Sequence, residues 1–311
     1  MISNKFKSSL ETSFLFIIPA ASPEKLVEIV GRTCYKSEDK ITEDSYKTFV
    51  DNLIKRNHFA MLEHGRLTFK LMLDSQDSVA KLKIKLDAEI MLNAIPKVYS
   101  DIDWESNTIY LNVSMSHLFN PRYKDTVIQD YCLKGYKGEE CVYSDVRIKI
   151  VKDLNEENVT NTFKKQATHI TVKFVCDRGV SHELVRHRFA IAQESQRYCR
   201  YGSGKFGDDI SFICPTDIDE DSAEYLIWKS AISFCEQTYL KLLEVGQPPQ
   251  VSRSVLPNST KTEVILTANL LEWKHFFDMR LRGTTGKPHP DMIYVANIAH
   301  ESIKEVLKYE L

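Results

Sequence analysis

The segment from Ser181 to Tyr201, SHELVRHRFAIAQESQRYCRY, concentrates positive charge in a chain whose total charge is nearly balanced. Its arginines are Arg186, Arg188, Arg197 and Arg200. A single arginine there could compensate a helix dipole, but several arginines with interleaved tyrosines are suited to bind phosphates and planar heterocycles. The segment therefore favours an anionic ligand that contains a ring. A solvated basic face paired with carboxylates is the alternative.

Metal and nucleophile chemistry are less well supported by the same segment. His182 and His187 are five residues apart, about 140° round a helix, whereas the zinc-binding pair of H-E-x-x-H needs i, i+4 spacing. Ser195 lacks the G-x-S-x-G surroundings of a hydrolase nucleophile. Cys199 lies between Arg197 and Arg200, which would lower its pKa if it were exposed, but a buried small residue is the favoured interpretation. We therefore expect no metal and no catalytic cysteine.

Phosphate loops are also weakly supported. The segments YGSGKFG and GTTGKP do not match G-x-x-x-x-G-K-[ST], so solvated loops are favoured for both. No G-x-G-x-x-G follows a predicted strand. A flavin or nicotinamide would therefore not bind in an ordinary Rossmann fold.

Two further arginines lie among apolar residues. In NLLEWKHFFDMRLRG, the residues Trp273, Phe276 and Arg280 follow helical spacing, so that Arg280 extends the apolar stripe of its predicted helix. In QVSRSVLP, Arg253 lies among apolar residues such as Val251 and Val255, just before a proline. Because an unpaired buried arginine is costly, we expect both arginines to point inward, toward either a protein carboxylate or a ligand.

Composition excludes several classes of protein. The chain has 311 residues, 43% of them hydrophobic, with 41 basic and 43 acidic residues, so no net field favours nucleic acid or an anionic membrane. Seven cysteines without a C-x-x-C pair favour reduced thiols. The apolar run from Phe14 to Ala21 lacks a basic n-region, so we interpret it as a buried first strand and not a signal peptide. We expect a cytoplasmic protein without membrane or nucleic-acid partners.

Periodicity predicts the elements that position these residues. Ser22 and Pro23 are typical of a helix start, and a second helix is expected from Glu43 to Lys55. Alternation predicts strands in GRLTFKLML and in HITVKFVCD, which we expect to be neighbours in one sheet. The more polar region between them, about 74–168, contains a predicted strand at TIYLNVSM and a loop at CLKGYKGEEC. We interpret it as an insertion in a single catalytic domain spanning 1–311.

The C-terminal half is predicted to be mostly helical. An apolar stripe at helical spacing, which we expect in the core, consists of Tyr225, Trp228, Ile232, Cys235, Tyr239 and Leu242. Two more helices are expected, from about Asn269 to Arg282 and from Pro290 to Tyr309, with RGTTGKPHP as the loop between them.

These motifs resemble the flavin-dependent thymidylate synthases. That family has R-H-R, then a serine and R-Y, and here the segment reads RHRFAIAQESQRY. The resemblance extends in the same order through MLEHGRLTFKL, VSRSVLP, ANLLEWKHFFDMRL and GKPHPDM. Six residues separate Arg188 from Ser195 where the family usually has seven, so we place a one-residue gap near Ala190. The resemblance implies an α/β fold with a central, mainly antiparallel sheet, flanking helices and an inserted region.

The resemblance also implies an activity and roles for individual residues. The activity would be reductive methylation of dUMP to dTMP, with methylenetetrahydrofolate as the one-carbon donor and NADPH-reduced FAD as the hydride source, in a homotetramer with shared active sites. The residues that would contact FAD are Arg186, His187, Arg188, Gln193, Asn269 and His275. Those that would bind dUMP are Glu183, Arg186, Gln193, Ser195, Gln196, Arg197, Arg253 (from a neighbouring subunit) and Arg280. Arg280 would be catalytic, activating the uracil ring.

Two alternatives remain open. One is a nucleotide-binding relative that has lost catalysis through the shortened loop after Arg188. The other is a nucleic-acid-binding module that uses the arginines and tyrosines for phosphate contact and stacking. The near-neutral net charge and the inward position expected for Arg280 argue against the second alternative.

Overall fold

A four-stranded antiparallel sheet lies at the centre of the computed structural model, which describes residues 9–19, 22–92, 97–138, 140–143, 145–197, 201 and 210–308. Its strands, in spatial order, are β2 (Phe14–Ile18), β8 (His169–Asp177), β11 (Lys261–Asn269) and β9 (Ala190–Gln193). The central strands β8 and β11 are buried along most of their length, because helices cover both faces of the sheet.

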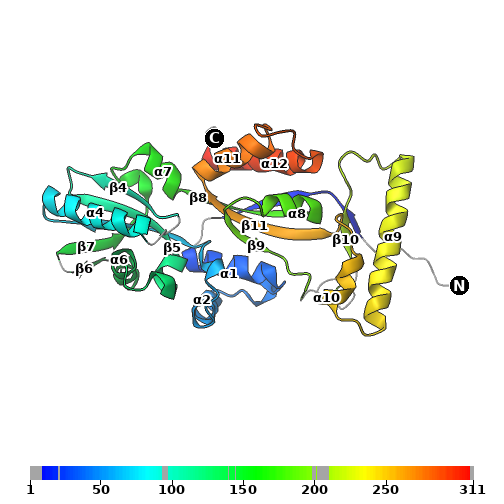
Figure 1. Ribbon diagram of the computed structural model, residues 1–311, viewed down its shortest axis with the longest axis horizontal. Helices are drawn as coiled ribbons and strands as arrows, with labels where there is room; N and C mark the ends of the chain where they lie inside the picture. The colour runs from blue at the N-terminus through cyan, green and yellow to red at the C-terminus, as the bar shows by residue number, and fades with distance from the viewer. Residues whose placement is uncertain are drawn as a thin grey trace.

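Helices cover one face of this sheet. They are α8 (Arg178–Leu184), α11 (Leu270–Arg280) and α12 (Pro290–Leu307), which group together in Figure 1. The side chains of Trp273, Phe276 and Phe277 in α11 are fully buried. The Trp273 indole N–H donates to the carbonyl of Ile170 in β8 at 3.1 Å. The predicted helices and the loop between them are confirmed, and the core on this face holds α11 against the sheet.

Helices α1 (Pro23–Cys34) and α2 (Ser45–Lys55) lie on the other side of the sheet (Figure 1). Val30 of α1 packs on Ala192 and Ile265. The predicted start of α1 is confirmed, because the Ser22 hydroxyl accepts a hydrogen bond from the Lys25 N–H and Pro23 takes the first helical position. The predicted second helix is confirmed as well. The short helix α3 (Phe59–Leu62) follows.

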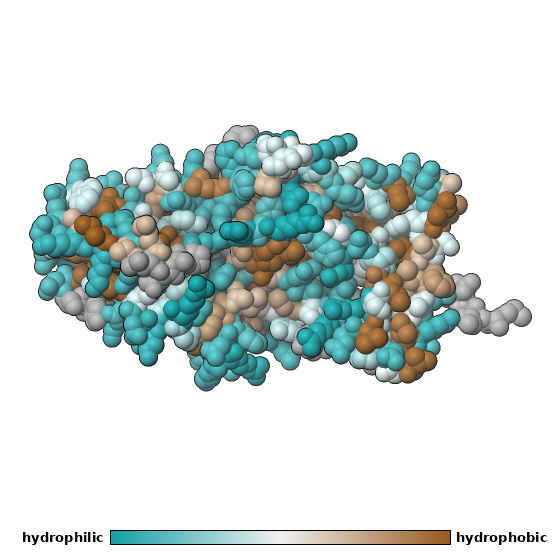
Figure 2. Space-filling view, in the orientation of Figure 1, coloured by the Kyte–Doolittle hydropathy of each residue, from teal (hydrophilic) through white to brown (hydrophobic). Residues whose placement is uncertain are grey.

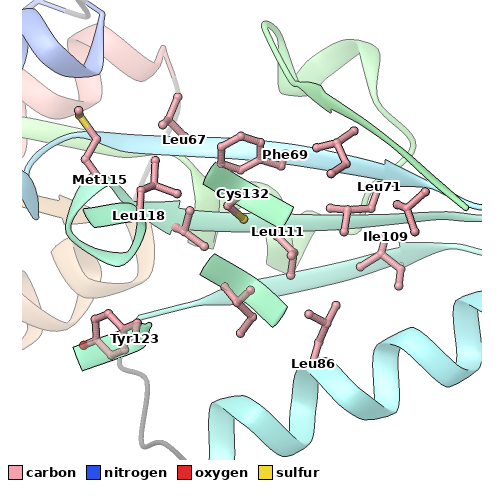
Figure 3. Packing of buried hydrophobic residues seen from close by; sticks show 14 of the residues in the cluster. Leu67, Phe69, Leu71, Leu86, Ile109, Leu111, Met115, Leu118, Tyr123 and Cys132 are labelled. Carbon is pink, nitrogen blue, oxygen red and sulfur yellow. The ribbon is translucent and has the colours of Figure 1, made fainter. Parts of the chain in front are cut away.

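A second antiparallel sheet forms one end of the molecule (Figure 1). In spatial order its strands are β4 (Tyr99–Asp103), β5 (Thr108–Ser114), β3 (Arg66–Met72), β7 (Val146–Ile150) and β6 (Glu140–Tyr143). Helices α4 (Gln76–Leu92) and α6 (Val127–Tyr136) contribute Leu86 and Cys132 to its core. Figure 3 shows Phe69, Leu111 and Cys132 packed together there. The same core includes Val27, Val50 and Leu62 of α1, α2 and α3, so the inserted region shares its hydrophobic core with the N-terminal helices.

Three expectations about these strands and loops are corrected. Strand β3 is not a neighbour of β8, because β5 and β7 of the inserted region pair with both of its edges. Strand β2 is an edge strand and not a buried one, with Phe14 39% and Phe16 54% exposed. The segment CLKGYKGEEC is not simply a loop, since α6 continues to Tyr136 before the chain leaves the helix.

The opposite end of the molecule is built around the long helix α9 (Ala223–Glu244). The remaining elements there are β1 (Ser9–Glu11), β10 (Ser211–Ile213), α10 (Pro249–Ser252) and η4 (Arg253–Val255). Of the predicted apolar stripe, Tyr225, Ile232 and Tyr239 are buried, whereas the other members are only partly buried. The outer surface over α9 carries apolar side chains (Figure 2), including the exposed Ile227 and Phe234.

The predicted fold class is confirmed: an α/β protein with a mainly antiparallel central sheet and flanking helices. Short elements of the inserted region are α5 (Met115–Phe119), η2 (Pro121–Tyr123), η3 (Leu154–Glu156) and α7 (Asn161–Ala167), and η1 (Glu38–Lys40) follows α1. Among the described helices, none is both long and apolar enough to cross a bilayer.

Candidate functional site

A cavity of about 510 Å³ lies where α11, the segment after α8 and the inserted region meet. Six of the residues predicted from the sequence line it: Arg186, His187, Arg188, Asn269, His275 and Arg280. Apolar walls come from Phe189, Leu271 and Met279. A shallower depression of about 700 Å³ on α12 contains none of the predicted residues. The cavity beside α11 is therefore the candidate site.

The R-H-R segment follows the C-terminal end of α8. Asp177 caps the start of this helix by accepting the Val180 N–H at 2.9 Å, and the helix ends at Leu184. Arg186 and Arg188 therefore lie in the turn beyond it, where both are exposed. No described residue receives a hydrogen bond or an ion pair from either guanidinium group. Both remain available to an anionic ligand.

Arg280 is held in a fixed orientation at the wall of the cavity. Its Nη1 donates to Glu183 Oε2 at 2.6 Å, its Nε donates to His187 Nε2 at 3.0 Å, and its Nη2 donates to the Glu183 carbonyl at 3.3 Å. The expected inward position is confirmed, and the anionic partner in this chain is a protein carboxylate. An arginine has five N–H donors, and these bonds use three of them. One N–H on each terminal nitrogen remains for a ligand.

His187 is a neutral imidazole. It is 8% exposed, and burial, followed by the electrostatic influence of Arg280 and His275, lowers its pKa to about 4. Because its Nε2 accepts from Arg280, the ring proton belongs on Nδ1. The ring packs edge-on against Phe276, with centroids 4.9 Å apart. His187 thus orients Arg280 without adding a second positive charge.

Asn269 is occupied by structural hydrogen bonds. Its Oδ1 accepts the Glu272 N–H at 2.9 Å, and Glu272 Oε2 accepts the Asn269 N–H at 3.0 Å, which completes a capping box at the start of α11. Its Nδ2 donates to Tyr99 Oη at 2.9 Å. Because Asn269 is only 1% exposed, its amide faces Tyr99 more than it faces the cavity.

Gln193, the last residue of β9, and Ser195, Gln196 and Arg197, which follow this strand, do not line the cavity. Gln193 Nε2 donates to Ser181 Oγ at 3.0 Å, and the Ser195 N–H donates to the Cys34 carbonyl at 3.0 Å. Gln196 is buried, and Arg197 Nε contacts Gln250 Oε1 at 3.4 Å.

Arg253 and Ala190, near which the one-residue gap is placed, do not line the cavity. The expectation that Arg253 points inward is wrong for this chain, since η4 leaves it exposed. Burial, together with the positive charge of Arg253, lowers the pKa of Arg178. The shortened loop does not disturb the sheet, because Ala190 to Gln193 pairs with Thr267 to Val264 in an unbroken register. Tyr198, Cys199, Arg200 and most of YGSGKFG lie outside the described residues.

A buried cluster of charges lies under β9 and was not predicted. Lys36 forms ion pairs with Glu194, at 3.6 Å, and with Glu263, and Lys173 forms one with Glu263 at 2.6 Å. Burial and the Glu263 charge raise the pKa of Glu194. Burial alone would lower the pKa of Lys36, but the Glu194 and Glu263 carboxylates raise it. The cluster anchors the backbone next to Ser195.

Further residues near the site were missed. Tyr99 and Gln166 line the cavity from the inserted region, which carried no recognisable motif. His64, within MLEHGRLTFKL, is fully buried with its Nδ1 2.7 Å from Thr267 Oγ1. Burial lowers its pKa to about 3. Among the described residues no group of His, Cys, Asp and Glu is placed to hold a metal ion.

The buried histidines predict acid sensitivity. His64 and His187 have pKa values of about 3 and about 4 in the folded chain against about 6.5 when unfolded. The unfolded state therefore binds more protons below pH 6.5, and the free energy of unfolding falls as the pH drops from about 6.5 toward 4. Each histidine should contribute a loss of about 2 kcal/mol between pH 7 and pH 5.

Urea unfolding at pH 7 and pH 5 measures this loss. His64→Asn should reduce the difference between the two pH values by about 2 kcal/mol, whereas replacement of the exposed His58 by Asn should leave it unchanged. An equal pH dependence in wild type and His64→Asn would contradict the prediction.

Residues 17–76 and 125–307 match the model of the thymidylate synthase complementing protein family. The chain belongs to this family. Two proteins named flavin-dependent thymidylate synthase, from Geobacter sulfurreducens and Pyrococcus furiosus, are each 36% identical to it, over 104 and 107 residues. These alignments cover 33% and 34% of this chain and 43% of each relative. The matched part thus spans less than half the length of these relatives.

A solved structure is also similar. It is the UMP/dUMP methylase PolB from Streptomyces cacaoi bound with 5-Br dUMP, which aligns over 96% of this chain and 92% of that chain, at 14% identity and a TM-score of 0.41. This degree of similarity carries no information about a shared ligand.

Proposed function

We propose that this chain is a flavin-dependent thymidylate synthase, which converts dUMP to dTMP with methylenetetrahydrofolate as the one-carbon donor and NADPH-reduced FAD as the hydride source. The observation that carries the proposal is the arrangement of Arg280. Its guanidinium group stands at the wall of the cavity, oriented by Glu183 and by a neutral His187, with N–H donors left over. Membership of the family supports the same function.

The cavity suits a flavin. Its volume of about 510 Å³ is typical of cofactor sites, and the side chains of Phe189, Leu271 and Met279 offer apolar surface to a planar ring. The exposed guanidinium groups of Arg186 and Arg188 suit the phosphates of FAD. We assign FAD contacts to Arg186, His187, Arg188, Gln193, Asn269 and His275. When bound, the reduced flavin supplies the hydride.

Arg280 is assigned the catalytic role. Uracil C5 is a poor nucleophile that becomes more reactive when negative charge accumulates on the N3 and carbonyl edge of the ring, and a guanidinium group already in place at that edge stabilises this charge without reorganisation. Hydrogen bonds to Glu183 and His187 fix the orientation of the guanidinium plane. Because His187 is neutral, it does not compete with Arg280 for the developing charge. Arg280 needs no change of protonation state during the reaction.

The remaining substrate contacts are assigned by residue type. They are Glu183, Arg186, Gln193, Ser195, Gln196, Arg197 and Arg253. The Ser195 hydroxyl and the Arg197 guanidinium group suit the dUMP phosphate. The exposed position of Arg253 suits a residue that reaches the site of a neighbouring subunit in a homotetramer.

We treat 1–311 as one catalytic domain with an insertion at about 74–168. Strand β3 precedes the insertion and is nevertheless the central strand of the sheet that the insertion builds. This shared strand supports a single folding unit.

The absorption spectrum of the purified protein, with and without added FAD, tests the function. The proposal predicts flavin absorption bands that remain with the protein through gel filtration. A colourless protein that does not bind added FAD would contradict it, and binding to DNA that is lost with salt would then favour the nucleic-acid-binding alternative. A protein that binds FAD and dUMP but forms no dTMP would favour the inactive relative.

A further inference from the structure

The inserted region contributes directly to the candidate site. Tyr99, the first residue of β4, and Gln166, in α7, both line the cavity beside Arg280. Helix α7 and strand β4 belong to the sheet and helices at the insertion end of the molecule (Figure 1). The cavity is therefore not complete without the insertion.

The phenol of Tyr99 has an unused donor. Its oxygen accepts a hydrogen bond from Asn269 Nδ2 at 2.9 Å, so its own O–H must point elsewhere. Among the described residues no acceptor receives this O–H. Asn269 itself is turned toward Tyr99 and toward the start of α11 and is 1% exposed. Tyr99 thus presents an O–H donor to a ligand at this wall of the cavity.

Neighbouring contacts hold Tyr99 in place. The Arg66 guanidinium group lies over its ring, 5.6 Å from the centroid, and the ring packs with Phe163 and Ala167. Lys97, two residues earlier, forms an ion pair with Glu272 at 2.8 Å and donates to the backbone carbonyl of Arg188. These contacts join the insertion to the R-H-R segment and to α11, so the Tyr99 hydroxyl is positioned before a ligand arrives.

We propose that Tyr99 is a ligand-contacting residue supplied by the inserted region, whose O–H donates a hydrogen bond to an acceptor atom of the planar heterocycle bound in the cavity. A flavin ring presents such acceptors as carbonyl oxygens and ring nitrogens. Burial and the charge of Glu272 raise the pKa of Tyr99, which keeps the donor protonated at neutral pH. The inference rests on the proposed function in taking FAD as the ligand.

The test compares Tyr99→Phe with a matched control, Tyr110→Phe. Tyr110 lies on the neighbouring strand β5, where its hydroxyl donates to Glu157 at 2.8 Å, and it does not line the cavity. Both variants lose one phenol hydroxyl from the same sheet. After flavin is removed, the Kd for FAD is measured by fluorescence titration, the melting temperature is measured without FAD, and the visible spectrum is recorded at saturating FAD.

We expect Tyr99→Phe to raise the Kd for FAD about tenfold, which corresponds to about 1.4 kcal/mol, and to shift the visible bands of the bound flavin. Tyr110→Phe should bind FAD with a Kd within about twofold of wild type. An unchanged Kd in Tyr99→Phe, or an equal increase in both variants, would overturn the inference. If Tyr99→Phe is much less stable than the control, the spectrum decides, because a wild-type spectrum at saturation would also overturn it.

The inference and the proposed function fail in different ways. A wild-type chain that binds no FAD would overturn the proposed function, and this inference with it. A wild-type chain that binds FAD and forms dTMP, alongside a Tyr99→Phe variant indistinguishable from it, would overturn only the role of Tyr99.

Discussion

Arg280→Ala should lower the rate of dTMP formation about 100- to 1,000-fold, the usual effect of removing a donor aimed at developing charge. The variant loses the guanidinium group that stands at the cavity wall, and it leaves the Glu183 carboxylate without its 2.6 Å partner. Arg280→Lys should not restore the rate, because a lysine cannot bond Glu183, His187 and a ligand together in one plane. The assay measures dTMP formed from dUMP, methylenetetrahydrofolate, NADPH and FAD.

Arg282→Ala is the matched control for this prediction. Arg282 follows the same helix, but its side chain is 41% exposed and pairs only with Asp278, at 2.8 Å. We expect its dTMP formation to equal that of wild type. Circular dichroism and thermal melting establish that each variant is folded. A folded Arg280→Ala variant with the wild-type rate would show that the catalytic role assigned to Arg280 is wrong.

Lys36→Ala should destabilise the fold by about 3 kcal/mol, because removing one partner from a buried ion cluster leaves uncompensated charge. Lys36 forms an ion pair with Glu194, and both Lys36 and Lys173 form ion pairs with Glu263. Without Lys36, the Glu194 and Glu263 side chains, 5% and 11% exposed, repel one another. Urea unfolding at pH 7 measures the loss.

The loss should shrink as the pH falls toward 5. The pKa of Glu194 is already raised by burial and by Glu263 in the wild-type chain, and it should rise further without Lys36. A carboxyl group whose folded pKa exceeds its unfolded pKa binds protons preferentially in the folded state, so acid then favours folding. Lys47→Ala is the control, since the Lys47–Asp44 pair is exposed and should contribute little. Equal melting temperatures for Lys36→Ala and wild type would contradict the prediction.

Local signals in the sequence were sufficient for several elements. Ser22 and Pro23 start α1 as predicted, because a cap requires only neighbouring residues. Helical spacing alone also placed Arg280 on the buried side of α11, next to Trp273 and Phe276. In both cases, the physical requirement is met within one or two turns of the chain.

Strand neighbours could not be predicted in the same way. Alternation in β3 indicates which side chains share a face, but it does not indicate which strand lies alongside. Strand β3 pairs with β5 and β7, although β8 has an equally suitable pattern. The buried cluster of Lys36, Glu194 and Glu263 was missed for the same reason, since its members come from three segments that only the sheet brings together.

The order of residue types along the chain was enough to indicate the family, the arginine-rich character of the site and the inward orientation of the Arg280 side chain. Those features depend on motifs and helical period, which are local. The partners of these residues depend on the fold: Glu183 and His187 for Arg280, and Tyr99 for Asn269. Hydrogen bonds between distant segments form only after strand pairing and packing have fixed their approach, so Tyr99, inside a region with no recognisable motif, becomes part of the site only in three dimensions.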